Sequence, residues 1–278
     1  MTNNDIRTAN TDEIEAQNVP PLPTSDQVAE SNFVKSEAGE QHDGETEKSN
    51  KKLKFWLRIS SGVLLTATLV LVGYLFWQFV WTGMQADSAQ NELINSQNWT
   101  YEPEEVAERE KGEPPSLPTP TREGEMMGVV YVSAFGKEYY RTLVEGTDRS
   151  VLDLYGFGHF RSTVMPGEIG NFAAAAHRNG YGAPMQNAPL MVEGTNIMIR
   201  TRDYWYVYKV TGSEIVTPES SDVLFPVPHE PETIPTKRLL TFTTCHPEYS
   251  DAERWIVYAE FDYWAKTENG VPKELKDL

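Results

Sequence analysis

The chain of 278 residues carries 41 acidic and 24 basic side chains, which gives a formal net charge of −17. No basic patch stands out, so the composition argues against nucleic acid as a partner. The single cysteine, Cys245, excludes a disulfide within the chain. Because the acids are concentrated in two segments with few large apolar residues, the folded part should be shorter than the whole chain.

Residues 1–50 form the first acidic segment, with eleven acids and three bases. Such a segment cannot bury enough apolar surface to offset the conformational entropy that is lost on ordering. We therefore predict a disordered acidic tail.

Residues 51–84 contain a basic flank followed by a long apolar stretch. No charged residue occurs at positions 59–86. A helix of this length, at ~1.5 Å per residue, extends roughly 40 Å, enough to cross a hydrocarbon core of ~30 Å. A cleaved signal peptide has a shorter apolar region. A buried core helix is also less consistent with a stretch that is apolar on all sides, so we predict a single transmembrane helix.

The charges on the two sides of this stretch predict its orientation. Lys51, Lys52, Lys54 and Arg58 precede it, whereas the following residues are acidic. By the positive-inside rule, the tail is cytoplasmic and the C-terminal part lies outside the cell membrane. Residues 85–125, rich in Pro and Glu, are expected to form a stiff, solvated extracytoplasmic linker.

Residues 126–266 have the pattern of short strands separated by turns. Segments such as "GNFAAAAH", "RLLTFTTC" and "RWIVYAEFDYW" are apolar runs of strand length, and only "RTLVEGTDRSVLDLYG" has a weak helical period. The pattern predicts an all-β domain, a closed antiparallel barrel with short helices. Residues 267–278 are expected to form a flexible C-terminal tail.

Metal and nucleotide motifs are not found in the sequence. It has no Walker loop, GxSxG, HExxH or CxxC. The histidines of the C-terminal part show no spacing typical of metal ligands: His159, His177, His229 and His246. We expect no metal and no cofactor.

Cys245 ends a strand-like run and is followed by the loop "HPEYSD". Alternation places Thr243 and Cys245 on one face of the strand and Phe242 and Thr244 on the other. A thiol at a loop mouth can meet a substrate, although a lone cysteine is often only a small buried apolar residue. Cys245 is therefore structural, intermolecular or reactive.

A nucleophilic thiol needs a cationic or imidazole neighbour. His246 is adjacent in sequence, but neighbouring residues of a strand point to opposite faces. His177 ends another strand-like run and is better placed, although it could be a surface histidine in a turn. Arg254 begins the strand after the cysteine loop, where a hairpin could bring it beside Thr243 or Cys245. There it could stabilise an oxyanion or merely pair with Glu253 or Asp251.

The order of the candidate residues narrows the choice of enzyme class. His177 precedes Cys245 by 68 positions, whereas papain-like peptidases place the cysteine first. Caspase-like enzymes share the order but use a Cys-Gly context and an α/β fold.

These residues resemble those of the sortase family, and most of all its class E, actinobacterial group. "TFTTC" is similar to the TLxTC signature, and "MPGEIGNFAAAAHRNGYGAPM" is similar to the segment PGxxGNxxxAGHR that carries the family's histidine. The arginine nine positions after the cysteine also matches. The resemblance covers residues 126–264 and implies an eight-stranded sortase β-barrel behind an N-terminal membrane anchor.

The resemblance implies that Cys245 is the nucleophile, His177 the general acid and base, and Arg254 the oxyanion-stabilising residue. It also suggests substrate contacts, which we assign to Tyr181, Thr243 and Thr244. Tyr181 resembles a tyrosine associated in class E with preference for Ala over Pro in the sorting signal.

The implied reaction is transpeptidation at the Thr–Gly bond of an LPxTG-like or LAxTG-like sorting signal, through a thioester on the cysteine. The implied partners are surface proteins with such a signal, a peptidoglycan precursor amine or a pilin lysine, and membrane lipid. Two alternatives stay open: a non-catalytic envelope-binding module on a membrane stalk, and a cysteine peptidase that hydrolyses without transfer.

Two positions depart from the family pattern. Phe242 stands where the signature has Leu, and because it points away from the Cys245 face we expect only a change of packing. Ala176 stands where AGHR has Gly, which should add a methyl group near the site and could shift His177.

Overall fold

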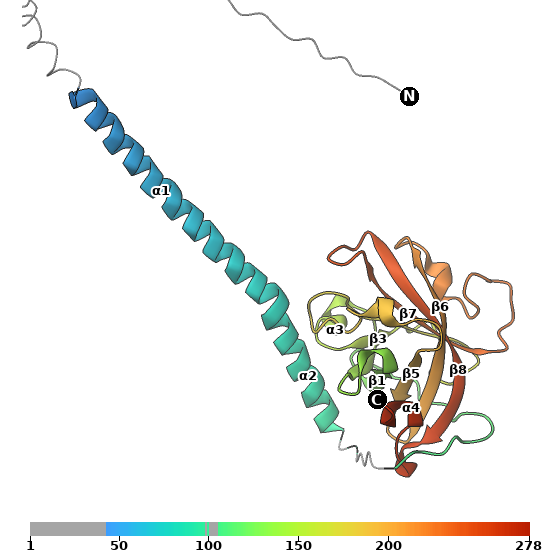
Figure 1. Ribbon diagram of the computed structural model, residues 1–278. Coiled ribbons are helices and arrows are strands. Elements are labelled where there is room, and N and C mark those ends of the chain that lie inside the picture. Colours follow the sequence, from blue (N-terminus) through green and yellow to red (C-terminus); the bar gives the residue numbers. More distant parts are fainter. Residues whose placement is uncertain (1–42, 98, 100–104) are drawn as a thin grey trace, which may run out of the picture. The chain divides into compact units, whose positions relative to one another are not determined.

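The computed structural model describes residues 43–97, 99 and 105–278. The first 42 residues of the predicted tail lie outside this part of the chain. The chain divides into two units, Met1–Thr68 and Leu69–Leu278, and the second holds the barrel. Figure 1 shows the order of the elements.

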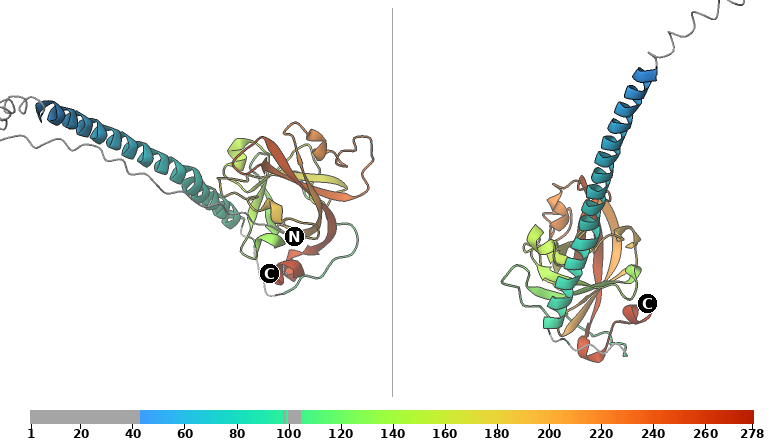
Figure 2. Two further views of the ribbon diagram at one scale, coloured as in Figure 1. Left: turned by 45° about the horizontal axis from the view of Figure 1, so that its top comes forward. Right: turned by 90° about the vertical axis from the view of Figure 1, so that its left-hand side faces the viewer.

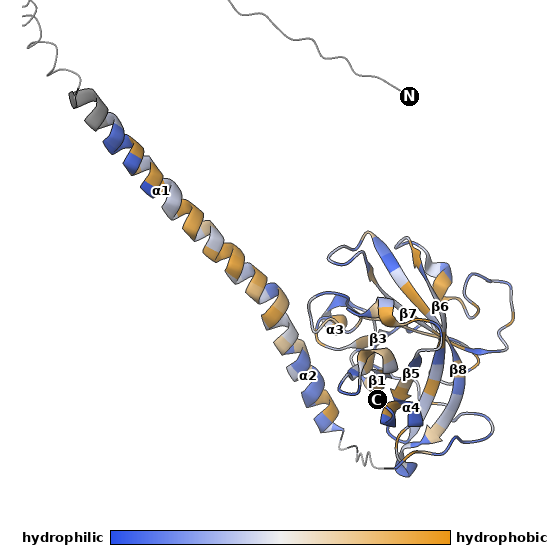
Figure 3. Cartoon of the chain, viewed as in Figure 1, coloured by the Kyte–Doolittle hydropathy of each residue, from blue (hydrophilic) through white to orange (hydrophobic). Residues whose placement is uncertain are grey.

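Three consecutive helical elements precede the barrel. They are α1 (Asp43–Phe76), a five-residue π-helix η2 (Trp77–Trp81) and α2 (Thr82–Ser96). Among the described residues, one helical run is long and apolar enough to cross a membrane, and none of its most apolar 18-residue window is buried in protein. Figure 3 shows this window as a mostly apolar stretch in the middle of the helical run. The predicted apolar N-terminal helix is confirmed as a candidate membrane span.

Eight strands close into a barrel in the order β1-β2-β3-β4-β7-β8-β6-β5, as predicted. Figure 1 labels most of them, and Figure 2 gives two further views. The strands are β1 (Met126–Val132), β2 (Arg141–Glu145), β3 (Phe157–His159), β4 (Gly170–Ala175), β5 (Asn196–Arg200), β6 (Tyr204–Val216), β7 (Arg238–His246) and β8 (Glu253–Lys266).

The barrel is not wholly antiparallel, which corrects one expectation. β2 pairs with β3 and β4 pairs with β7 in parallel. Parallel neighbours need a crossover connection, and both pairs have one. A short helix α3 (Arg149–Leu152) lies between β2 and β3, and β5 and β6 lie between β4 and β7 in the chain.

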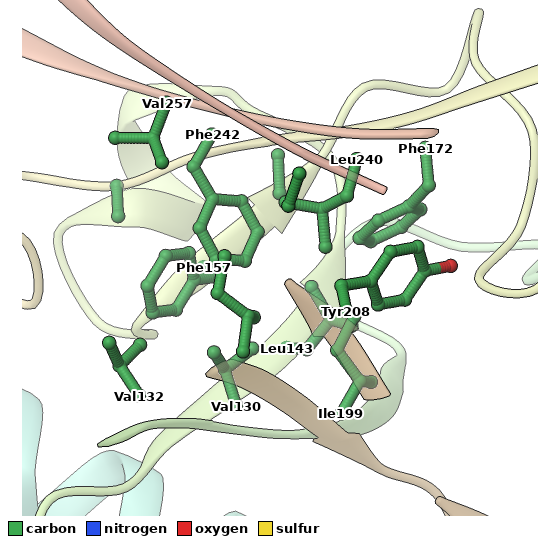
Figure 4. Close-up of a cluster of buried hydrophobic side chains, with 14 of the residues drawn as sticks. Val130, Val132, Leu143, Phe157, Phe172, Ile199, Tyr208, Leu240, Phe242 and Val257 are labelled. Carbon is green, nitrogen blue, oxygen red and sulfur yellow. The ribbon is translucent and has the colours of Figure 1, made fainter. Parts of the chain in front are cut away.

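The interior is filled by side chains from alternate positions of the strands. Phe157, Phe172 and Phe242 are fully buried, and the rings of Phe157 and Phe242 lie 4.6 Å apart between centroids. Figure 4 shows these rings packed together with Leu240, among other apolar side chains. Burying each such side chain stabilises the fold by about 1.5–3 kcal/mol.

The linker differs from the expected solvated spacer. Helix α2 continues to Ser96, and residues 105–125 include a segment packed on the barrel. Val106 forms a β-bridge with Val271, and the buried Ala107 donates its backbone N–H to the Val271 carbonyl at 2.7 Å. Ala107 joins a buried cluster with Trp205 and Val271, which packs this part of the segment against the barrel.

The C-terminal segment also differs from the expected flexible tail. It forms a 3₁₀ turn η6 (Thr267–Asn269) and a short helix α4 (Lys273–Lys276), and it buries Val271 and Leu275. The remaining 3₁₀ turns are η3 (Ser133–Phe135), η4 (Ala188–Leu190) and η5 (Ser221–Leu224).

Candidate active site

The parallel pairing of β4 and β7 brings His177 and Cys245 to the same edge of the barrel. The register pairs Ala175 with Thr243, an offset of 68 residues. His177 and Cys245 lie two positions further along and differ by the same 68, so alternation projects both side chains from one face. That face is the outer one, because Phe242 and Ala176, at the alternate positions, belong to the barrel core.

Arg254 lies directly opposite Cys245 in the antiparallel ladder of β7 and β8. Its guanidinium donates to the backbone carbonyls of Asp251 and Glu253, both at 2.9 Å. These contacts involve carbonyls rather than the carboxylates considered from the sequence. A guanidinium has five donors, so the group can serve the loop and still donate to an oxyanion.

Cys245, His177 and Arg254 line one cleft of about 360 Å³. The far wall of the cleft comes from the loop between β6 and β7, which includes η5 and contributes Val223 and Leu224. The predicted substrate contacts Thr243 and Thr244 also line it, whereas Tyr181 is not among its lining residues. The three candidate catalytic groups therefore face a space with an apolar wall that can hold an extended peptide.

A buried asparagine holds this loop against the barrel. Asn171 is 1% exposed, and its Nδ2 donates to the carbonyls of Val223 and Phe225, both at 3.1 Å. Its Oδ1 accepts from the Thr241 hydroxyl at 2.8 Å. The side-chain amide is thus satisfied on both ends, which fixes the wall of the cleft relative to β4 and β7.

Asp153, the residue directly after α3, orients His177 and was missed by sequence reasoning. Its Oδ1 lies 2.9 Å from His177 Nε2. Tyr181 stacks on the other side of the site against the His177 ring, with 4.9 Å between centroids. Tyr181 also forms a hydrogen bond with Arg149. This bond is the largest cause, and the charge of Asp153 the second, of a raised pKa of the Arg149 guanidinium. The imidazole is thus held by a carboxylate and an aromatic face.

Arg178 contacts His246, and neither residue lines the cleft. Its Nη1 donates to His246 Nδ1 at 2.8 Å and to the Cys245 carbonyl at 3.4 Å, and its guanidinium lies 5.4 Å from the Trp255 ring centroid. Because arginine is only a donor, His246 Nδ1 is the acceptor in this contact. The contact leaves His177 as the histidine that lines the cleft with Cys245.

Thr244 and Ala176, which both line the cleft, also contribute to the framework of the barrel. Thr244 is 3% exposed, and its hydroxyl donates to the Ala176 carbonyl at 2.8 Å, which ties β7 to the end of β4. The extra methyl group of Ala176 points into the barrel core and away from the Cys245 face. No group of three or more His, Cys, Asp or Glu side chains in the described part of the chain could hold a metal ion.

Comparison with known proteins gives consistent matches. The family model for the sortase domain matches residues 130–262. Sortase SrtE2 of Streptomyces coelicolor is 30% identical over 226 residues, which cover 77% of this chain and 86% of that protein. Among solved structures, the SrtA sortase from Actinomyces oris has a TM-score of 0.57 and 37% identity, covering 60% of this chain and 96% of that one.

Solved class E structures are similar as well. Sortase E from Streptomyces avermitilis has a TM-score of 0.51 and 31% identity, covering 56% of this chain and 99% of that one. Sortase E1 from Streptomyces coelicolor, solved with a tripeptide in the active site, has a TM-score of 0.51 and 29% identity. It covers 55% of this chain and 97% of that chain.

Proposed function

Because the chain belongs to the sortase family of cysteine transpeptidases and is class E-like, we propose that it cleaves an LPxTG-like or LAxTG-like sorting signal between Thr and Gly. The product is transferred to a cell-wall amine. The observation that carries the proposal is the convergence of Cys245, His177 and Arg254 on one cleft. The tripeptide in the active site of the related sortase E1 supports a peptide substrate.

In the first step, the Cys245 thiolate attacks the carbonyl carbon of the threonine. Negative charge develops on the carbonyl oxygen, where Arg254 can donate a hydrogen bond from its position opposite the cysteine. The C–N bond then breaks while the His177 imidazolium gives its proton to the glycine nitrogen. The result is a thioester on Cys245 and a free glycine amine.

In the second step, a primary amine attacks the thioester carbonyl. His177 removes a proton from the amine, Arg254 again stabilises the oxyanion, and the thiolate leaves. Asp153 keeps the ring of His177 oriented through both proton transfers, because its carboxylate lies 2.9 Å from Nε2. One difficult amide exchange is thus divided into two easier steps: His177 protonates the leaving amine in the first, and the thiolate leaves in the second.

The location and partners complete the proposal. The apolar helix anchors the enzyme in the cell membrane with its N-terminus in the cytoplasm and the barrel outside. Its partners are surface proteins with a sorting signal, and the acceptor is a peptidoglycan precursor amine or a pilin lysine. Thr243 and Tyr181 contact the signal peptide. Thr244 lines the same cleft and contacts the signal peptide as well, while its hydroxyl is bonded to the end of β4.

An amine test separates this proposal from the two alternatives. The full chain is incubated with an LAxTG-type or LPxTG-type peptide, with and without triglycine. Transfer product supports a transpeptidase, and cleavage by water alone supports a peptidase. No thiol-dependent turnover supports a binding module.

Mass spectrometry of the acyl-enzyme tests the residue roles. Cys245→Ala should abolish the adduct, and Arg254→Ala should lower its formation by roughly 10²–10³-fold or more, as expected for loss of an oxyanion donor. His246→Ala is the matched control for His177→Ala and should still acylate. An inactive His246→Ala with an active His177→Ala would show that the general base is assigned to the wrong histidine.

A further inference from the structure

The loop that follows His177 contains a left-handed turn, residues 180–183. Gly180, Tyr181, Gly182 and Ala183 have φ angles of 64°, 50°, 76° and 40°. Glycine adopts this region freely, but for residues with a side chain it is unfavourable and is normally visited only by single residues. Tyr181 and Ala183 therefore keep this conformation only because contacts with the rest of the protein hold it.

The left-handed turn determines where the Tyr181 ring lies. The ring stacks on His177, with 4.9 Å between centroids and 27° between the planes. Tyr181 also forms a hydrogen bond with Arg149, whose Nε lies 3.5 Å from Asp153 Oδ2. The other carboxylate oxygen of Asp153 lies 2.9 Å from His177 Nε2. The position of Tyr181 thus affects the imidazole directly and through the Asp153 carboxylate.

Thr82, the first residue of α2, contacts the left-handed turn from outside the loop. Thr82 is 4% exposed. Its Oγ1 accepts from the Tyr181 backbone N–H at 3.3 Å and donates to the Gln78 carbonyl at 2.7 Å. A hydroxyl has one donor and two acceptor sites, so it can make both bonds at once. This hydroxyl therefore joins the backbone of the helical run to the backbone of the left-handed turn.

A second connection joins the left-handed turn to α2 through Arg141. Its Nη2 donates to the Gly182 carbonyl at 3.2 Å and lies 4.0 Å from Asp87 Oδ1. Gln90 is 4% exposed and holds α2 on the barrel, because its Oε1 accepts from the Thr142 backbone N–H at 3.2 Å. The helix is therefore fixed close to the point where Thr82 meets the turn.

Thr82 lies within the uncharged residues 59–86, in the helical run that is the candidate membrane span. A membrane span needs no buried hydroxyl at this position, since valine has nearly the same shape and is apolar. The loop does need one, because a backbone N–H that is shielded from water requires an acceptor. The helical run therefore contributes a polar contact to the loop beside His177.

Resting on the proposed transpeptidation, we infer that Thr82 is a positioning residue for His177. Its hydroxyl holds the Tyr181 backbone in the left-handed turn, and the Tyr181 ring holds the imidazole for the proton transfers of the proposed mechanism. The end of the candidate membrane span is thereby part of the framework of the active site and not a tether alone.

The test compares Thr82→Val and Thr82→Ser with wild type, as full chains in phosphatidylcholine nanodiscs. Thr82→Val keeps the shape of the side chain and removes the hydroxyl, whereas Thr82→Ser keeps the hydroxyl. Thr68→Val is the matched control, because the exposed Thr68 hydroxyl makes the same kind of bond back to the helix, to the Leu64 carbonyl at 2.9 Å. Single-turnover acylation by a sorting-signal peptide gives the maximal rate and the half-saturating peptide concentration.

NMR of isotope-labelled histidine reports on the contact without reference to activity. The stacked Tyr181 ring shifts the proton resonances of the His177 imidazole, so a change in the stacking moves these resonances. The His177→Ala spectrum assigns them, because it lacks the signal of this histidine.

We expect Thr82→Val to lower the maximal rate of acylation about fivefold, as for the loss of one neutral hydrogen bond, with the half-saturating concentration within about twofold of wild type. The His177 resonances should move in Thr82→Val and stay in place in Thr82→Ser, which should acylate at nearly the wild-type rate. Thr68→Val should match wild type in both measurements.

Equal acylation rates in Thr82→Val and Thr68→Val would overturn the inference, as would a slow Thr82→Ser or unmoved His177 resonances in Thr82→Val. If Thr82→Val does not fold, Thr82→Ala replaces it, and loss of folding in both would show a structural role instead. A wild-type protein that never acylates would refute the proposed function, whereas the NMR comparison would still test the contact between Thr82 and the His177 loop.

Discussion

The hydrogen bond between Asp153 and His177 predicts a measurable kinetic defect. The two atoms are 2.9 Å apart, and the side chains are 24% and 23% exposed. A hydrogen bond to an ionised group contributes about 1.5–3 kcal/mol, and partial exposure places this one at the lower end. If the bond orients the imidazole in the transition state, Asp153→Ala should slow acylation about tenfold.

The remaining variants separate charge from geometry. An asparagine side chain at this position would keep an acceptor oxygen of the same shape and lose only the charge, so Asp153→Asn should cost less than Asp153→Ala. Asp148→Ala is the matched control, because Asp148 is an exposed aspartate that begins the same short helix and makes no capping hydrogen bond with its side chain. Single-turnover acylation, followed by rapid quench and mass spectrometry, reports the step directly.

Two results would refute the positioning role of Asp153. The first is an Asp153→Ala acylation rate within about twofold of the Asp148→Ala rate. The second is a higher KM for the peptide with an unchanged kcat, which would indicate a contribution to substrate binding alone. A positioning role requires that kcat falls in Asp153→Ala and is partly recovered in Asp153→Asn.

Two further predictions concern stability and pH. A Cβ at Gly158 would clash with the backbone carbonyl oxygen of Gly146, so Gly158→Ala should prevent native folding. Gly212 has open space around it, so Gly212→Ala should leave the thermal midpoint of unfolding nearly unchanged. Equal midpoints for the two variants would contradict the close packing at Gly158. The hydrogen bond to Asp222, followed by the one to Glu214, raises the pKa of His229. The ion pairs that hold the β6–β7 loop are therefore complete while His229 is protonated. They weaken as pH rises through the raised pKa. After correction for intrinsic exchange rates, amide hydrogen exchange in the loop should therefore become faster in the wild-type protein as pH rises through the pKa of His229. The His229→Gln variant should not show this increase. The same increase in both proteins would exclude the histidine as its cause.

Much of the site follows from patterns that sequence shows directly. Period-two alternation places Cys245 and Phe242 on opposite faces, and the structure buries Phe242 in the core while Cys245 lines the cleft. The hairpin expected after Cys245 sets Arg254 opposite it. Each of these depends only on neighbouring residues along a strand or across one turn.

The features that sequence did not reveal depend on contacts between distant segments. Asp153 reaches His177 only because the parallel β2–β3 crossover sets α3 beside the end of β4. The order of residues 105–125 depends on a bridge to Val271, more than 160 positions away. The composition shows that this segment is polar and rich in Pro. It does not show whether the few apolar residues of the segment pack against another part of the protein.

The placement of His177 and Cys245 at one edge of the barrel is a consequence of the strand register, and polar contacts help to fix that register. A slip of one residue between β4 and β7 would turn His177 from the outer face toward the barrel interior, because side chains alternate with a period of two. Two side-chain hydrogen bonds oppose this slip at either end of the pair: Thr241 to Asn171 at 2.8 Å and Thr244 to the Ala176 carbonyl at 2.8 Å. The threonines before Cys245 therefore do more than shape the cleft. They hold the offset of 68 residues that brings the histidine and the cysteine to the same edge of the barrel. In the proposed mechanism, the threonine-rich signature therefore contributes through the geometry of the sheet.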